Sequence, residues 1–242
     1  MPDASSDPVS DPVLEISGLQ AWYGPSHALH GIGLHVKAGE LVTLLGRNGA
    51  GKTTTLRAIM GMVSKRKGSI LVRGRETSAL PSHRIARSGI AICPEDRGIY
   101  ASLTAEENLL LPRVVAEGGL TVDEILVLFP GLKERLKSPG MKLSGGEQQM
   151  LAIGRILRTG ARLLLLDEPT EGLAPVVVQQ IGAAVSDLKR RGYTILMVEQ
   201  NVRFASSIAD RHYVIDRGRV VDTFENRTLI DEFDRISALL SA

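Results

Sequence analysis

Short apolar runs, separated by glycine-rich or polar breaks, divide the chain and predict strands and helices in mixed order. Near the beginning, strands are predicted over 13–24 and within 33–46, where residues 37–40 form a turn between two apolar stretches. A helix is predicted over 53–62, and short strands over 69–74 and 89–93. The spacing becomes helical from residue 102 to about 160.

Two positions in this helical stretch have the spacing of a capping box. In such a box, an N-cap hydroxyl binds a backbone N–H, and a glutamate three residues later reaches back to the N-cap. The pairs are Thr104 with Glu107 and Thr121 with Glu124, and Pro130 is predicted to stop the helix that the second pair begins.

Strands return over 162–167 and 193–199, and a hairpin is predicted over 212–224 with its turn at Arg217 and Gly218. The run 163–166 is continuously apolar, which is typical of a strand covered on both faces of a parallel sheet. The pattern as a whole predicts an α/β fold, with an antiparallel β region at the N-terminal end and a helical subdomain near 102–160.

One helical stripe is predicted near the C-terminus, and we expect it to pack on the chain's own core rather than on a membrane or a partner. It consists of Leu229, Ile230, Phe233, Ile236 and Leu240.

Composition narrows the choice of protein class. The 242 residues carry 43% hydrophobic residues and a net charge of only +2, so nothing indicates a nucleic-acid surface. The single cysteine, Cys93, excludes an internal disulfide and is interpreted as a small buried side chain. No apolar run approaches the roughly 18 residues that span a bilayer. Residues 1–12 are polar and proline-rich and are predicted to form a disordered tail before a single domain, 13–242, that we expect in the cytoplasm.

A phosphate-binding loop is predicted where GRNGAGKT follows an apolar strand and precedes a helix. Glycines let several backbone N–H groups point at phosphate oxygens, and the helix N-terminus adds a partial positive charge. The lysine would bridge the β- and γ-phosphates of ATP, and the first threonine would ligate Mg²⁺. The predicted nucleotide-binding residues are Gly46, Arg47, Asn48, Gly49, Ala50, Gly51, Lys52, Thr53 and Thr54.

The stretch LLLLDEP places two carboxylates directly after a buried strand. Ligands of open α/β sheets bind at the carboxyl edge of the strands, so Asp167 is predicted to be a partner of Mg²⁺. Successive side chains of a strand point to opposite sides, so Glu168 is expected to have a different role. We assign Glu168 the task of orienting and deprotonating the attacking water; a solvated charge at the strand end is the alternative.

A third motif, LSGGEQQ, again has capping-box spacing between Ser144 and Glu147. Spacing alone leaves open whether this helix start is merely well capped or also meets a phosphate.

Together, GRNGAGKT, LLLLDEPT and LSGGE resemble the ATP-binding cassette family of ATPases, and the resemblance covers nearly the whole chain after residue 12. It implies that LSGGE faces the nucleotide held by the phosphate loop of a second, homologous subunit. On this basis the γ-phosphate is contacted by Ser144, Gly145 and Gly146, with Glu147 part of the same motif. Tyr23 matches the aromatic position that stacks on adenine, and a core tyrosine is the alternative.

Three positions depart from the commonest pattern of the family. Glu95 stands where a glutamine usually senses Mg²⁺, Gln200 where a histidine usually contacts the γ-phosphate, and Ala174 where an aspartate is usual. Glu95 could still bind Mg²⁺-bound water, and Gln200 can still donate an amide hydrogen, but it carries no proton for transfer. We therefore expect slower hydrolysis than in a relative with the histidine.

The residues at these three positions, together with the stretch PEDRGIYASLTAEENLLL, are similar to those of the ATPase subunits of branched-chain (hydrophobic) amino acid uptake transporters. Some members of that group carry urea, short amides or aromatic acids. The resemblance implies two integral-membrane permease subunits, a periplasmic substrate-binding protein acting through them, and a peripheral location on the cytoplasmic face of the inner membrane. The permease would dock in a groove near Glu95. A lipid or lipopolysaccharide exporter ATPase and a non-transport ATPase are the alternatives.

Overall fold

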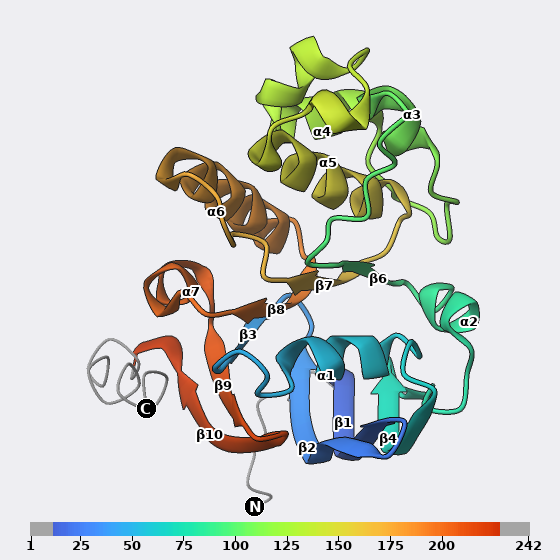
Figure 1. Ribbon diagram of the computed structural model, residues 1–242, viewed down its shortest axis with the longest axis vertical. Coiled ribbons are helices and arrows are strands. Elements are labelled where there is room, and N and C mark those ends of the chain that lie inside the picture. The colour runs from blue at the N-terminus through green and yellow to red at the C-terminus, as the bar shows by residue number, and fades with distance from the viewer. Residues whose placement is uncertain (1–11, 228–242) are drawn as a thin grey trace, which may run out of the picture.

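The computed structural model describes residues 12–227, which form two sheets and the helices packed on them (Figure 1). The central sheet has the strand order β10-β9-β3-β8-β7-β6. Its strands are β3 (Leu41–Leu45), β6 (Ile90–Cys93), β7 (Leu163–Asp167), β8 (Thr194–Glu199), β9 (Arg211–Asp216) and β10 (Arg219–Glu225). All neighbouring pairs are parallel except β9 with β10.

The central sheet is buried on both faces, and strand β7 shows how. Leu164 and Leu166 join the apolar cluster on the side of α5 and α6, whereas Leu163 and Leu165 join the cluster that includes α1 and the second sheet. Alternate residues of a strand point to opposite faces. The continuous apolar run is therefore explained, and the predicted parallel, doubly covered strand is confirmed.

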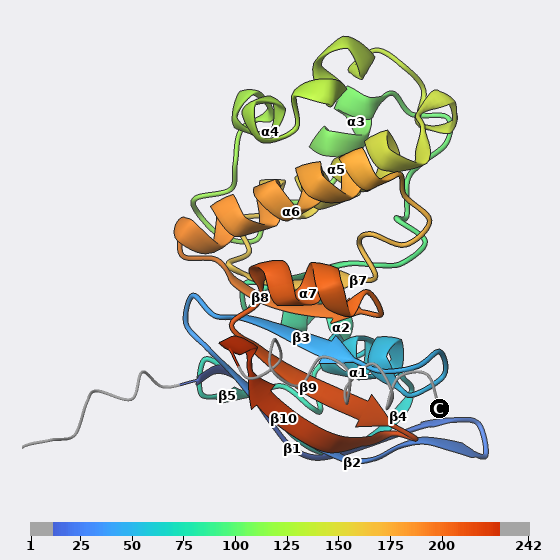
Figure 2. The same ribbon diagram turned by 90° about the vertical axis from the view of Figure 1, so that its left-hand side faces the viewer.

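The second sheet is antiparallel and has the order β2-β1-β4-β5. Its strands are β1 (Pro12–Tyr23), β2 (Ser26–Lys37), β4 (Lys65–Val72) and β5 (Arg75–Glu76). Helix α1 (Lys52–Ile59) shares one apolar cluster with both sheets, and the short helix α2 (Ser82–Ala86) precedes β6. Figure 2 shows the antiparallel sheet and helices α5 and α6 on opposite sides of the central sheet.

The predicted helical region lies at the upper end of Figure 1. It contains α3 (Ala105–Leu110), α4 (Val122–Leu128), two 3₁₀ turns (Pro130–Arg135 and Gly140–Lys142) and α5 (Gly145–Arg158). Helix α6 (Pro175–Arg190) follows β7, and α7 (Val202–Ile208) follows β8. None of the helices within 12–227 is both long and apolar enough to cross a membrane.

Several local predictions are confirmed. Each of the three capping boxes has both of its hydrogen bonds, at the starts of α3, α4 and α5. The hairpin turn at Arg217 and Gly218 is also present, with φ of 44° and 71°. Two positive φ values in succession are the mark of the tight turn that suits a twisted hairpin.

Other boundaries differ from the prediction. Helix α1 ends at Ile59 rather than at residue 62, because Gly61 adopts a φ of 70° that a helix cannot continue. Pro12 already pairs with Lys37, so β1 begins one residue inside the predicted tail. Residues 1–11 and the stripe from Leu229 to Leu240 lie outside the described residues. The predicted turn at 37–40 is present, and it joins β2 to β3, which belong to different sheets.

The turn between β9 and β10 is hydrogen-bonded to the phosphate loop. The Gly218 N–H donates to the Ala50 carbonyl at 2.8 Å, and the Gly218 carbonyl accepts from the His30 N–H at 2.8 Å. A Cβ on Gly218 would lie 2.3 Å from the Ala28 carbonyl oxygen. Only glycine fits this turn, because both the positive φ and the close approach exclude a side chain.

We predict that Gly218→Ala destabilises the fold more than Gly192→Ala does. Gly192 has a φ of 81° and open space around it, so its substitution carries only the backbone strain, about 1–2 kcal/mol. Gly218→Ala adds a clash with backbone, which costs about 1–3 kcal/mol more. Urea unfolding of both variants measures the difference, and equal losses would show that the turn can move away from Ala28 freely.

Candidate functional site

The start of α1 presents unpaired backbone N–H groups. Its N-cap residue, Gly51, has a φ of 110° and makes no side-chain cap, and the first turn of the helix contains no acidic residue. The first N–H groups of a helix otherwise seek a side chain, water or an anion. A helix end of this kind accommodates a phosphate.

Lys52 is folded back into the loop that precedes it. Its Nζ donates to the carbonyl oxygens of Gly46 and Arg47 at 2.8 and 3.0 Å, and lies 3.4 Å from Oε1 of Glu168. The side chain is 3% exposed. The ammonium group is therefore held by the loop, with the carboxylate of Glu168, whose side chain is 9% exposed, beside it.

The side chains of Thr53 and Asp167 are in contact at the edge of the central sheet. The Thr53 hydroxyl donates to Oδ1 of Asp167 at 3.0 Å. The pKa of Asp167 is raised to about 6, because burial penalises its charged form and the charges of Glu95 and Glu168 add to the effect; the Thr53 hydroxyl opposes it. The structure thus joins a hydroxyl from the phosphate loop to the carboxylate at the end of β7.

Glu168 lies just beyond β7, and its φ of 46° turns the side chain towards the phosphate loop. Its Oε2 accepts a hydrogen bond from Nε2 of Gln200 at 2.5 Å, while Oε1 faces Lys52. The partners of Glu168 are therefore different from those of Asp167, as expected. The cause is the backbone reversal at Glu168 rather than simple alternation along a strand.

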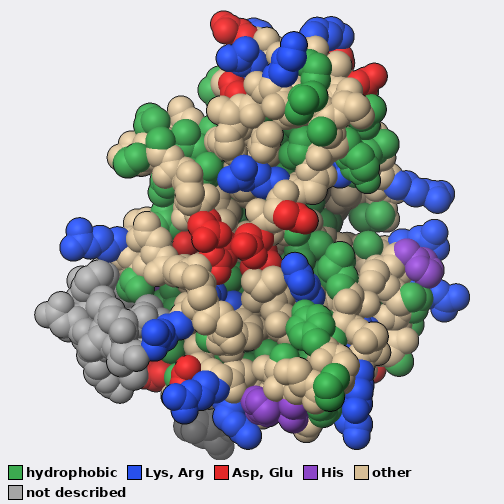
Figure 3. Space-filling view, in the orientation of Figure 1, with side chains coloured by type: hydrophobic (Ala, Val, Ile, Leu, Met, Phe, Trp, Pro, Cys, Tyr) green, Lys and Arg blue, Asp and Glu red, His purple; other side chains and the backbone are tan. Residues whose placement is uncertain are grey.

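Lys52, Thr53 and Glu168 line one pocket, which we call the P-loop pocket. Asp167 and Gln200 are hydrogen-bonded to it through Thr53 and Glu168. Acidic side chains also gather near the middle of the face shown in Figure 3. The pocket is lined by Asn48, Gly49, Gly51, Lys52, Thr53, Thr54, Glu95, Glu168 and Glu171. Glu95 comes from the segment after β6 and lies in the same pocket as the phosphate loop and Glu168, which is the place that the family resemblance implied for it.

Three residues of the phosphate-loop motif shape the loop instead of lining the pocket. The carbonyls of Gly46 and Arg47 hold Lys52, and Ala50 is 5% exposed, with its carbonyl bound by the hairpin turn. A Cβ at Gly46 would lie 2.4 Å from the carbonyl oxygen of Ile215 in β9. Close packing on the sheet therefore requires glycine at this position.

The LSGGE motif lies outside the P-loop pocket of its own chain. Ser144 is the N-cap of α5, and its Oγ accepts from the Glu147 N–H at 3.3 Å. Both oxygens of the Glu147 carboxylate accept hydrogen bonds. Oε2 accepts from the Ser144 N–H at 2.7 Å, and Oε1 accepts from Nε of Arg135 at 3.0 Å. Glu147 therefore serves the cap. A Cβ on Gly146 would lie 2.8 Å from the Val177 side chain in α6, so this glycine also serves packing.

Tyr23 is the last residue of β1 and is 43% exposed. This exposure excludes the alternative of a core tyrosine. Tyr23 is not among the described residues that line the P-loop pocket, so no contact in the structure tests its predicted adenine role. Cys93 is completely buried, and burial raises the pKa of its thiol to about 12, so the interpretation as a small core side chain is confirmed.

Sequence reasoning missed three polar residues beside the site. Glu171 lines the pocket, and its pKa is raised by burial and by the charge of Glu168. Thr170 and Glu199 are buried and joined by a hydrogen bond of 2.8 Å. The signal for Glu199 was available, because ILMVE is an apolar strand that ends in a carboxylate, the pattern that identified Asp167.

The side chains at the P-loop pocket fit Mg²⁺ only together with a nucleotide. Among residues 12–227, no group of three or more His, Cys, Asp or Glu side chains could hold a metal ion. Mg²⁺ takes six oxygen ligands and is usually held by one or two protein groups, phosphate oxygens and water. The Thr53 hydroxyl and the Asp167 carboxylate are oxygen donors of the right kind.

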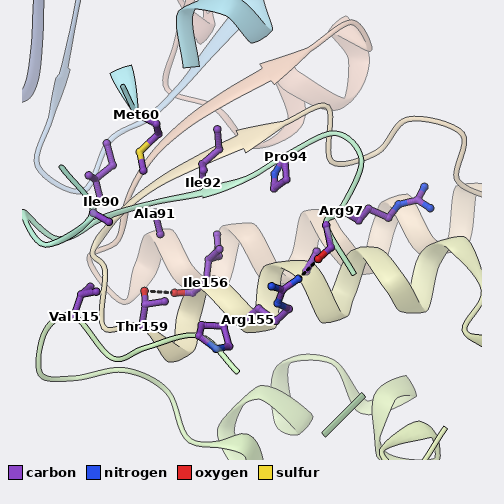
Figure 4. Close-up of a pocket in the computed structure, with 14 residues that line it drawn as sticks. Met60, Ile90, Ala91, Ile92, Pro94, Arg97, Val115, Arg155, Ile156 and Thr159 are labelled. Atoms are coloured by element: carbon purple, nitrogen blue, oxygen red, sulfur yellow. Dashed lines mark hydrogen bonds between the residues drawn. The ribbon is translucent and has the colours of Figure 1, made fainter. Parts of the chain in front are cut away.

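A second, largely apolar groove runs between β6 and helix α5 (Figure 4). It is lined by Pro94, Arg97 and Gly98, which lie on either side of Glu95 in the sequence, and by Arg155 and Ile156 of α5. Arg97 also bonds the side chains of Gln149 and Gln148 at 3.2 and 3.4 Å. The segment after Glu95 therefore connects the P-loop pocket, this groove and the start of α5.

Comparison with known proteins agrees with this geometry. The sequence model of the family described as "ABC transporter" matches residues 29–171. The chain is 45% identical over 212 residues to the high-affinity branched-chain amino acid transport ATP-binding protein BraG of Pseudomonas aeruginosa, covering 86% of this chain and 91% of BraG. It is 33% identical to the lipopolysaccharide export system ATP-binding protein LptB of Haemophilus influenzae, covering 87% of this chain and 90% of LptB.

Solved structures agree on the fold. A nucleotide-free ATP-binding cassette from an ABC transporter superposes with a TM-score of 0.80 at 22% identity and covers 96% of each chain.

The carboxyl of Glu199 is predicted to make stability depend on pH. Its pKa is raised from 4.5 to about 7, mainly by burial, against the hydrogen bonds that favour the charged form. The stabilising contribution is therefore complete below pH 4.5 and is lost as the pH rises through about 7, because only the unfolded chain releases the proton in between. Relative to Glu199→Gln, the unfolding free energy of the wild type is expected to fall by at most about 3 kcal/mol across that range. Urea unfolding at several pH values measures this, and a constant difference would contradict it.

Proposed function

The chain belongs to the ATP-binding cassette family of transporter ATPases, and we propose that it powers the uptake of branched-chain or other hydrophobic amino acids, or of a related small solute such as an amide, urea or an aromatic acid. The observation that carries the import assignment is the 45% identity to BraG over nearly the full length of both chains. The lower identity to LptB, 33%, makes export of lipopolysaccharide the second candidate.

ATP would bind with its phosphates at the N-terminal end of α1. The uncapped N–H groups after Gly51 and the Lys52 ammonium supply the positive potential that triphosphate needs. Lys52 has three N–H donors, of which two bind carbonyls of the loop and the third faces Glu168. An incoming γ-phosphate oxygen would compete with Glu168 for this third donor and so release the carboxylate for catalysis.

Thr53 and Asp167 would hold Mg²⁺, and Glu95 would bind water of its coordination shell. When bound, Mg²⁺ neutralises charge on the β- and γ-phosphates. Ionised Asp167 is required for this role. Because its pKa of about 6 still lies below neutral pH, the carboxyl is largely ionised there despite its burial.

Glu168 would accept a proton from the water that attacks the γ-phosphate. General-base catalysis of this kind contributes about 10²–10⁴-fold. Gln200 donates its amide hydrogen to Oε2 of Glu168, so it can orient the carboxylate, but it cannot relay a proton as histidine can. For this reason we keep the hypothesis of slower hydrolysis than in a histidine-containing relative.

The complete site would require two cassettes, either two copies of this chain or this chain with a homologous one. Ser144, Gly145 and Gly146 lie outside the P-loop pocket of their own chain, so they are free to meet a γ-phosphate held by another subunit. Tyr23, exposed at the end of β1, would stack on the adenine. Glu147 would act indirectly, by capping the helix that carries the glycines.

The groove in Figure 4 would receive a cytoplasmic helix of the permease. Its apolar lining, next to Glu95, would connect movement of the membrane subunit to the nucleotide site. In this proposal the chain lies on the cytoplasmic face of the inner membrane and meets the periplasmic substrate-binding protein only through the permease. Neither the net charge of +2 nor the pocket geometry indicates nucleic acid.

Two variants separate binding from hydrolysis. Lys52→Ala is expected to abolish ATP binding, because it removes the buried cation of the pocket. Glu168→Gln is expected to bind ATP but to lower turnover about 100-fold or more and to accumulate a closed dimer. Fluorescent ATP-analogue binding, phosphate release and size-exclusion chromatography measure the three properties. Glu106→Gln is the control, because Glu106 pairs with Lys137 and is not among the described residues that line the P-loop pocket.

In cells that carry the complete transporter, either variant should reduce uptake of radiolabelled leucine to background. Wild-type turnover in Glu168→Gln would remove this residue from the role of base. Intact uptake of every branched-chain amino acid, together with a defect in lipopolysaccharide export, would replace the import assignment with the second candidate.

A further inference from the structure

Glu199 is a buried carboxylate to which the ATPase chemistry above gives no task. It is the last residue of β8 and is 3% exposed. Within the described part of the chain it forms no ion pair with lysine, arginine or histidine. A carboxylate removed from water without a cation costs free energy unless hydrogen bonds satisfy its oxygens.

Three donors from two loops satisfy this carboxylate. The Thr170 hydroxyl, from the loop after β7, donates to Oε1 at 2.8 Å. The backbone N–H groups of Gln200 and Asn201, from the loop after β8, donate to Oε2 at 3.2 and 3.3 Å. Glu199 therefore ties together the two loops that follow adjacent strands of the central sheet.

Both loops carry groups of the hydrolytic site. The loop after β7 starts at Glu168, whose N–H donates to the Val198 carbonyl at 3.0 Å. The loop after β8 carries Gln200, whose amide reaches Glu168. On the far side, Asn201 caps α7 by accepting the Phe204 N–H at 3.0 Å. The position of the Gln200 side chain thus depends on a backbone segment that Glu199 holds by two of its N–H groups.

We propose that Glu199 is a positioning residue for hydrolysis, which clamps the loops after β7 and β8 so that the Gln200 amide stays against Glu168. It is not among the described residues that line the P-loop pocket, and it acts through Gln200 and the Thr170 loop. The proposal rests on the proposed function, because Glu168 must be the base for its orientation to matter.

The test compares three variants in steady-state ATP hydrolysis, with ATP-analogue binding measured separately. Glu199→Leu keeps the volume but leaves the three donors unpaired, and it is expected to lower kcat about tenfold while KM for ATP changes less than about threefold. Glu199→Gln restores the contacts, since its carbonyl accepts the two N–H groups and its amide can donate to the Thr170 hydroxyl, so at least about half of kcat should return. Thr170→Val removes one donor only and should lower kcat about threefold.

A second arm distinguishes positioning from general loss of structure. In a Gln200→Ala background, Glu199→Leu should lower kcat by less than about twofold, because the side chain that it positions is gone. An equal loss in both backgrounds, a rise in KM with unchanged kcat, or no recovery in Glu199→Gln would overturn the proposal. If Glu199→Leu does not fold, Thr170→Val in the two backgrounds gives the same comparison.

A failure of the proposed function would look different. In that case the wild-type chain would not hydrolyse ATP, or Glu168→Gln would hydrolyse it normally, whatever the Glu199 variants do.

Discussion

The parallel register of β3, β7 and β8 is the constraint on which the site depends. Leu45 pairs with Glu199 and Asp167 pairs with Val198, so the three strands end at one level. The phosphate loop follows β3, Glu168 follows β7 and Gln200 follows β8. Segments more than 100 residues apart therefore converge at one edge of the sheet, where ligands of open α/β sheets bind.

The convergence of these strands brings several carboxylates close together around one lysine. Glu95, Glu168 and Glu171 line the same pocket as Lys52, and Asp167 lies beside them. Burial and mutual repulsion raise the pKa of Asp167, Glu171 and Glu199. A pocket with several carboxylates and one buried lysine is poorly balanced alone, and binding of Mg²⁺ with ATP would supply the missing positive charge at the acidic side and the anion at Lys52 and α1. The same cluster of carboxylates thus explains both the raised pKa values and the proposed need for Mg²⁺.

The sequence predicted those parts of the fold that depend on local pattern. The four leucines before Asp167 require two covered faces, the Ser144 and Glu147 spacing requires a cap, and Arg217-Gly218 requires a tight turn; all three are present. The phosphate loop and the two carboxylates at the end of β7 were predicted for the same reason, because each stands where an apolar strand ends in the sequence.

The remaining features depend on contacts between distant segments. The positive φ of Glu168 is uncommon for a residue other than glycine, and no pattern in the sequence predicted it. The bond from Thr170 to Glu199 joins loops 29 residues apart, and the bond from Gly218 to Ala50 joins a hairpin to the phosphate loop. Such long-range hydrogen bonds need the assembled sheet before they can form.

In the proposed function, one chain contains two incomplete halves of a catalytic site, since LSGGE lies away from the P-loop pocket of its own chain. The most direct test is ATP turnover per chain as a function of chain concentration, for the wild type and for Ser144→Arg. We expect turnover per chain to rise as chains associate, and Ser144→Arg to abolish turnover while ATP still binds. A turnover per chain that stays constant down to strictly monomeric concentrations, and that Ser144→Arg leaves unchanged, would contradict it.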